Sequence, residues 1–227
     1  MELSGLILEL SQAHSPAGCE TRAADKISAY LRACMDEVRV DVMGNVIACR
    51  RCGVENAPKL LLDAHMDEIG LIITGMEEGY ARFSLLGGVD ARTLPGREVY
   101  LLTEGEPLYG VIACLPPHVL SAEQREQTIE VKDMYIDLGL DEAQAKARVP
   151  LGTPGVFRGH AEVLNGKYIC GKALDDKACV ATILDAVSKM CIRDRYTAAW
   201  TLSSPSAMES RMPGRLRAVS SCACRWS

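Results

Sequence analysis

Apolar residues recur at intervals of three and four positions in two segments near the start of the chain. This spacing predicts helices over residues 2–13 and 20–35, because side chains three and four positions apart lie on one helix face. Three short apolar runs, over residues 38–42, 46–49 and 59–64, predict strands. The third run, KLLLDA, is nearly all apolar, which is typical of a strand covered on both faces of a sheet.

The pattern changes character between residues 69 and 159. Short runs of β-branched and aromatic residues alternate there with turn pairs such as Gly87-Gly88, and this spacing is typical of a small β-barrel. One helix, over residues 141–148, interrupts the strands. A strand over residues 167–170 and a helix over 178–189 then return to the earlier style.

The layout predicts an α/β chain, in which a three-layer α/β/α domain is interrupted by an inserted small β-barrel. Residues 1–67 are expected to form the first part of the α/β domain, residues 68–164 the barrel, and residues 165–190 the second part of the α/β domain. Residues 191–227 form a tail of different composition. We expect this tail to have no defined place in the core.

Composition narrows the class of protein. Hydrophobic residues make up 48% of the 227 residues, which is enough for a packed core. The net charge of -5 offers no basic surface, so nucleic acid is not an expected partner. The sequence has no apolar run of the roughly 20 residues that a membrane helix needs, and its start lacks the basic region of a signal peptide. The 10 cysteines lack a framework spacing, so we expect reduced thiols in the cytoplasm.

The first segment with candidate chemistry is Asp63-Ala64-His65-Met66-Asp67-Glu68. His65 ends an apolar strand, at the edge where an α/β sheet opens into a crevice. Residues two apart in an extended chain point to the same side, so Asp67 can reach the His65 ring. A carboxylate on the second ring nitrogen is the usual partner of a metal-binding histidine. The alternative is a surface H-x-D pattern that holds no metal.

The second segment is Gly171-Lys172-Ala173-Leu174-Asp175-Asp176-Lys177, between a predicted strand and a predicted helix. Adjacent carboxylates disfavour each other's ionisation unless a cation compensates. The alternative is that Asp175 or Asp176 is an ordinary helix N-cap. A further pair, Cys49 and Cys52, has C-x-x-C spacing but no second pair, and we interpret it as the end of a strand with two thiols.

Together these segments resemble the tetrahedral, dodecamer-forming metallo-aminopeptidases of metallopeptidase family forty-two. The resemblance runs from about residue 3 to 189 and includes several further segments: Ser15–Glu20, Asp41–Asn45, Gly110–Ile112, Pro116–His118, Asp133–Asp137 and Gly152–Pro154. It implies a catalytic domain with an inserted barrel that helps assembly, peptide substrates, a homo-oligomer (a dodecamer), and two divalent metal ions, zinc or cobalt.

The resemblance also implies roles for single residues. His65 would bind one metal ion, and Asp175 would bridge both. Asp67 would orient His65 and tune the site, and is the catalytic-site residue of this segment. The Asp175–Asp176 peptide bond is expected to be cis. Cys179 stands where the family usually has glycine and could crowd the site, whereas His118 is expected to be structural.

The family's remaining site residues, an adjacent Glu-Glu pair, an Asp and a final His, would follow the point that matches Lys189. The resemblance therefore implies an aminopeptidase that removes N-terminal residues by a metal-activated water, with this chain carrying half of the site and being inactive as written. Two alternatives stay open. One is a related dinuclear-metal deacylase or carboxypeptidase, although its insertion is typically α+β and follows the Glu pair. The other is a non-catalytic assembly fragment.

The tail departs from the family pattern at Met190. Its six arginines and two acidic residues give residues 191–227 a net charge of +4, against -5 for the whole chain. The run Lys189–Arg195 resembles the translation of a transposase end used in sequencing libraries. Ser210–Leu216, shifted by one base, can encode a segment similar to the family's Val-Gly-x-Arg-Gly-Ala. We therefore interpret residues 191–227 as an adapter-derived or frameshifted non-native tail; the alternative is a genuine, lineage-specific tail.

Overall fold

The computed structural model describes residues 2–51, 53, 55, 59–190 and 198–203, and their contacts divide the chain into two compact units. The first unit contains the residues up to Asp67 and those from His160 onward, and the second contains Glu68–Gly159. The second boundary therefore lies at Gly159, before the expected position at residue 164. It does so because the hairpin of β10 (Glu162–Leu164) and β11 (Tyr168–Cys170) belongs to the first unit.

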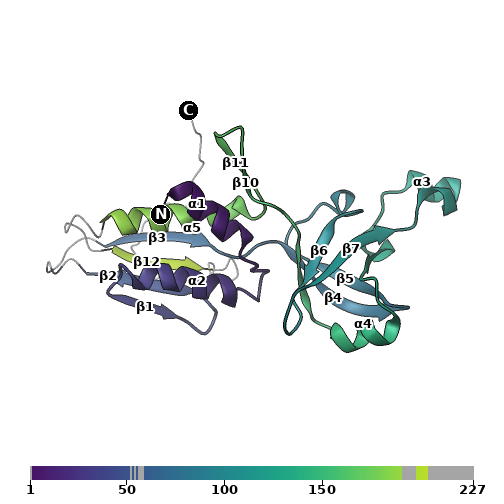
Figure 1. Cartoon of the computed structure of the whole chain (residues 1–227), viewed down its shortest axis with the longest axis horizontal. Helices are drawn as coiled ribbons and strands as arrows, with labels where there is room; N and C mark the ends of the chain where they lie inside the picture. Colours follow the sequence, from purple (N-terminus) through teal and green to yellow (C-terminus); the bar gives the residue numbers. More distant parts are fainter. Residues whose placement is uncertain (1, 52, 54, 56–58, 191–197, 204–227) are drawn as a thin grey trace. The chain divides into compact units, whose positions relative to one another are not determined.

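The first unit is built on a sheet with the strand order β1-β2-β12-β3. Its strands are β1 (Glu37–Val40), β2 (Val46–Arg50), β3 (Leu60–His65) and β12 (Ala198–Ser203). Helices α1 (Leu3–Gln12) and α5 (Leu174–Met190) lie on one side of the sheet, and α2 (Thr21–Arg32) lies on the other (Figure 1). This is the predicted three-layer α/β/α arrangement.

Apolar faces of the three helices form the core of this unit. Leu6, Leu10, Ile27, Leu31 and Val187 lie on the faces that the three- and four-residue spacing of apolar positions defines, and all five are at most 5% exposed. Burying a side chain of this size stabilises the fold by about 1.5–3 kcal/mol. The predicted faces of the helices are therefore confirmed, and they hold the sheet from both sides.

Strand β12 corrects one expectation. The prediction that residues 191–227 have no defined place in the core is wrong for Ala198–Ser203. These residues pair antiparallel with β2, from Ala198 opposite Arg50 to Leu202 opposite Val46. They also pair parallel with β3, where Ser203 lies opposite His65. The physical reason is that β2 and β3 each present an edge of backbone donors and acceptors, and a strand between them satisfies both. Residues 191–197 and 204–227, with Trp226, lie outside the described residues.

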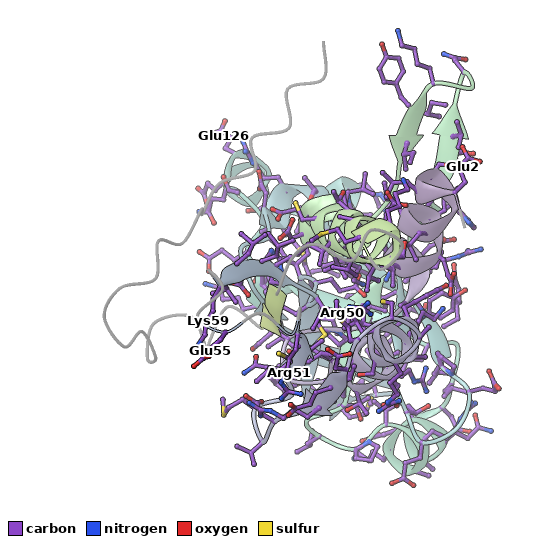
Figure 2. All side chains as sticks on the ribbon, turned by 90° about the vertical axis from the view of Figure 1, so that its left-hand side faces the viewer. Glu2, Arg50, Arg51, Glu55, Lys59 and Glu126 are labelled. Atoms are coloured by element: carbon purple, nitrogen blue, oxygen red, sulfur yellow. The ribbon has the colours of Figure 1, made fainter. Side chains whose placement is uncertain are left out.

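The two ends of the sheet differ in chemistry. Figure 2 looks onto the end where β2 finishes and β3 begins, with the charged side chains of Arg50, Arg51 and Lys59 labelled. His65 lies at the other end of β3. Six strand residues at about 3.3 Å each separate the two ends by roughly 20 Å. The charged end is therefore too far away to contribute to a site at His65.

The second unit is a closed barrel with the strand order β4-β5-β8-β7-β6-β9. Its strands are β4 (Gly70–Glu77), β5 (Tyr80–Leu86), β6 (Glu98–Leu101), β7 (Leu108–Cys114), β8 (Met134–Asp137) and β9 (Pro154–Phe157). Closure leaves the barrel without a free edge. The predicted β-barrel is confirmed, since only a single 3-10 turn, η1 (Ala91–Thr93), interrupts the strands between residues 70 and 112.

Short helical segments complete the barrel unit. Helix α4 (Glu142–Arg148) begins at a capping box, in which the Asp141 side chain accepts a hydrogen bond from the Gln144 backbone N–H. Three more segments, α3 (Ala122–Glu126), η2 (Pro117–Val119) and η3 (Val131–Asp133), connect strands. Among the residues that the structure describes, no helix is long and apolar enough to cross a membrane.

Candidate metal centre

His65 is the last residue of β3, and its side chain is 33% exposed. Strand β3 runs parallel to β12, so His65 lies at the carboxyl end of a parallel pair, where α/β sheets bind ligands. Asp67 follows two residues later and is buried. The distance from His65 Nδ1 to Asp67 Oδ1 is 3.2 Å, and the predicted contact between these side chains is therefore confirmed.

Asp175 approaches the same ring from the other side. It lies in the irregular first turn of α5, which follows β11, and the Asp175–Asp176 peptide bond is cis, as the resemblance implied. Backbone angles at both residues are non-helical, so the regular helix begins after them. The distance from His65 Nε2 to Asp175 Oδ1 is 3.2 Å. The predicted convergence of positions 65 and 175 at the sheet edge is confirmed.

Electrostatics follow from this arrangement. The pKa of His65 is raised to about 9, first because Asp67 accepts a hydrogen bond from the ring. Burial opposes this shift, while the charge of Asp67, the hydrogen bond to Asp175 and the charge of Asp176 reinforce it. Without a metal ion, His65 is therefore an imidazolium at neutral pH, and each of its ring N–H groups donates to a carboxylate.

The donor set determines which ion could bind. An imidazole nitrogen and a carboxylate oxygen are ligands that zinc and cobalt accept in proteins. The Nε2 and Oδ1 atoms lie 3.2 Å apart, and the Asp175 side chain is 97% exposed. Across the described part of the chain, no group of three or more His, Cys, Asp or Glu side chains could hold a metal ion. The residues present therefore fit part of a metal site.

The other candidate residues lie elsewhere. Cys179 is half-buried and packs against the core of the first unit. His118 lies in η2, within the barrel unit. Cys49 is a half-buried residue of β2, and Cys52 lies outside the described residues. No hydrogen bond between Cys179, His118 or Cys49 and the His65–Asp175 pair is seen, and these three described residues are not part of the pair.

Sequence reasoning missed two residues beside the pair. The Ser15 hydroxyl donates to the Met66 carbonyl at 2.8 Å, and the Lys177 ammonium donates to the Ala13 carbonyl at 2.5 Å. A signal for Lys177 was available, because it precedes the buried Val180 by one helical turn and so falls on the apolar face of α5. No local signal marked Ser15, whose partner is 51 positions away.

Solved structures of TET aminopeptidases share this fold. The TET aminopeptidase from Thaumarchaeota archaeon SCGC AB-539-E09 superposes with a TM-score of 0.83 at 28% identity, over 88% of this chain and 58% of that chain. The Pyrococcus horikoshii TET1 peptidase, which can assemble into a tetrahedron or a large octahedral shell, superposes with a TM-score of 0.79 at 33% identity. That match covers 89% of this chain and 61% of the peptidase.

Residues 44–204 match the M42 glutamyl aminopeptidase family, and the chain belongs to this family. The match includes β12, so it continues past residue 189, where the resemblance was expected to end. The lysyl aminopeptidase of Pyrococcus furiosus is 32% identical over 171 residues, which are 73% of this chain and 48% of that relative. The chain spans about half the length of the curated relatives that it matches.

Proposed function

We propose that the whole protein is a metal-dependent aminopeptidase that removes N-terminal residues from peptides. The observation that carries this proposal is the placement of His65 between Asp67 and Asp175, at 3.2 Å from each, in a chain of the M42 family. The closed barrel lies between His65 and Asp175 in sequence. This position favours an aminopeptidase over a related deacylase or carboxypeptidase.

Each of the three residues has a role in the proposal. His65 would hold a zinc or cobalt ion through Nε2, which must be free of its proton to act as a ligand. Asp67 keeps the Nδ1 proton in place and so fixes the orientation of the ring. Asp175, whose carboxylate is open to solvent, would hold the metal together with His65. When bound, such ions polarise a scissile carbonyl and lower the pKa of a water molecule.

The same proposal includes the oligomeric state, the substrates and the cellular location of the enzyme. One solved relative, PhTET1-12s, is a dodecamer in the asymmetric unit, and the Pyrococcus horikoshii TET1 peptidase can assemble into a tetrahedron or a large octahedral shell. These relatives support a homo-oligomer, with a dodecamer as the expected form. Peptides are the proposed substrates and the cytoplasm the proposed location. We expect the 227-residue chain by itself to be inactive, because zinc sites that keep their metal normally supply three or four protein ligands.

The test compares four forms of the full-length protein, with its native C-terminal half. The wild type is expected to hydrolyse aminoacyl-nitroanilides after zinc or cobalt is added. H65A should abolish this activity, and D67N should lower it by about 10–100-fold, the usual effect of losing a partner of a metal ligand. H160A, which removes an exposed histidine of the same unit, should leave the rate unchanged. Metal-independent hydrolysis, or full activity in H65A, would overturn the proposal.

A further inference from the structure

A short segment of the chain, residues 11–15, contacts both parts of the candidate site. The Ser15 hydroxyl, which is buried, donates to the carbonyl of Met66 at 2.8 Å, and the chain neighbours of Met66 are the candidate ligand and its carboxylate partner. At the other end, the Ser11 hydroxyl donates to the carbonyl of Lys172, in the turn before α5. Residues 11–15 therefore join two segments that are distant in sequence.

The close approach at Ser11 depends on a glycine. A Cβ atom built on Gly171 would lie 3.0 Å from Ser11 Oγ and 2.8 Å from the Cβ atom of Ala161. Contacts this short force neighbouring atoms to move. Gly171 thus allows the turn before α5 to lie directly against α1.

Lys177 also contacts this segment. Its side chain is 2% exposed, and Nζ donates to the Ala13 carbonyl at 2.5 Å. Removing an ammonium from water costs several kcal/mol, and an apolar side chain of similar volume at such a position is often neutral or stabilising. Packing alone therefore does not require a lysine here. What the ammonium adds is a directed bond that fixes the first turn of α5 to residue 13.

That first turn sets the position of Asp175. The Lys177 backbone N–H donates to the Ala173 carbonyl at 3.3 Å and closes the turn around the two aspartates. Because the Asp175 side chain is 97% exposed, packing does not hold its carboxylate. The backbone, anchored at Lys177, decides where the carboxylate stands.

We propose that Lys177 is a positioning residue, whose bond to Ala13 holds the Asp175 carboxylate within reach of His65 Nε2. The contacts form a closed path from His65 through Met66, Ser15, Ala13 and Lys177 to Asp175 and back to His65. The benefit of this positioning rests on the proposed function, because a fixed spacing between His65 Nε2 and the Asp175 carboxylate prepares both groups to bind one metal ion. Its geometric content can be tested without any metal.

The test uses the 227-residue chain, labelled with ¹⁵N, at a fixed pH of about 7 and without metal. The H65A spectrum assigns the two ring nitrogens of His65, whose chemical shifts report the hydrogen bond at each nitrogen. In K177M we expect the chemical shift of Nε2 to move to the value of a ring nitrogen exposed to water, because Asp175 no longer contacts it. The chemical shift of Nδ1 should stay the same, because Asp67 still accepts its hydrogen bond. K189M is the matched control, because Lys189 lies on the same helix in an exposed ion pair with Asp185.

S15A is a second variant, which removes the hydroxyl that binds the Met66 carbonyl next to His65. It should also move the Nε2 signal, whereas S28A, which removes a buried hydroxyl without a partner among the described residues, should not. An unchanged Nε2 signal in folded K177M overturns the inference. If K177M does not fold, an unchanged signal in S15A overturns it.

Zinc serves as the probe in a second arm. We expect K177M to weaken the response of the His65 signals to added zinc by about 10–100-fold, as the loss of a supporting residue does at other metal sites. If zinc leaves the wild-type signals unchanged, metal binding by this half of the site is wrong. The metal-free spectra still decide whether Lys177 positions Asp175.

Discussion

His65 Nε2 and Asp175 Oδ1 lie 3.2 Å apart, although 110 positions separate the two residues in sequence. Strand β3 brings the histidine to its carboxyl end, and the irregular first turn of α5 brings the aspartate to the same place. His65 comes from the sheet layer of the α/β/α unit, and Asp175 comes from a helical layer. The pair therefore forms only when strand and helix pack correctly, which makes it a sensitive reporter of the native fold.

Zinc should bind weakly to the 227-residue chain. His65 and Asp175 supply two donors, and the described residues hold no group of three or more that could bind a metal ion. Zinc titration calorimetry and hydrolysis of aminoacyl-nitroanilides check this expectation. Tight binding, or clear turnover by this chain, would show that the argument from missing ligands is wrong.

The central strand should be sensitive to proline. Thr201 pairs with Ile47 on one side and with Asp63 on the other. Thr201→Pro removes a backbone N–H inside the sheet and leaves its acceptor unpaired, which costs about 1–3 kcal/mol. Urea unfolding measures the loss. Thr201→Val keeps the N–H and should be close to neutral, and equal stability of both variants would argue against a central position for β12.

The barrel interior should reject a single methyl group at Gly155. A Cβ atom there would lie 2.6 Å from Leu71 Cδ1 and 2.9 Å from Leu101 Cδ2, and both leucines are fully buried. G155A should therefore lower the free energy of unfolding by about 1–3 kcal/mol through overpacking. G88A is the control, because no atom lies within 4 Å of the added methyl group. A thermal melt that does not separate the two variants would contradict the barrel packing.

The Tyr30–Glu9 hydrogen bond should make stability depend on pH. The Tyr30 hydroxyl donates to Glu9 Oε2 at 2.6 Å, which lowers the pKa of Glu9 below its ordinary 4.5 and raises that of Tyr30 to about 12. A lowered carboxyl pKa contributes stability that is present above pH 4.5 and is lost as the pH falls through the folded-state value. In the alkaline range, the raised pKa of Tyr30 contributes stability below pH 10 that is lost as the pH rises towards 12.

Urea unfolding of the wild type and Y30F tests the expected loss of stability at acidic pH. At pH 7 the wild type should be more stable by about 0.5–1 kcal/mol, a modest value because the pair is partly exposed to solvent. At pH 3 the difference should shrink. A difference that stays constant between these two pH values would mean that the Glu9 charge contributes nothing to the hydrogen bond.

Local patterns in the sequence were sufficient to predict the helices and strands and one contact of the site, between His65 and Asp67. The three- and four-residue spacing of Leu6 and Leu10 determined the inward face of α1, and frequent turns determined the change to a barrel. The two-residue spacing of His65 and Asp67 predicted their contact, because alternate residues of an extended chain share a side. Each of these inferences depends on neighbours within one element.

Contacts between elements were decided by the tertiary structure alone. Strand β12 lies between β2 and β3 because their edges face each other, and no composition rule for residues 191–227 could detect that. The family resemblance pointed to Asp175, but its distance from His65 depends on how α5 packs on the sheet. Lys177 was not singled out because a lysine usually faces solvent. Its spacing from Val180 places it on the apolar face of α5, but its bond to Ala13 follows from the position of α1 against α5, which is a property of the packed unit.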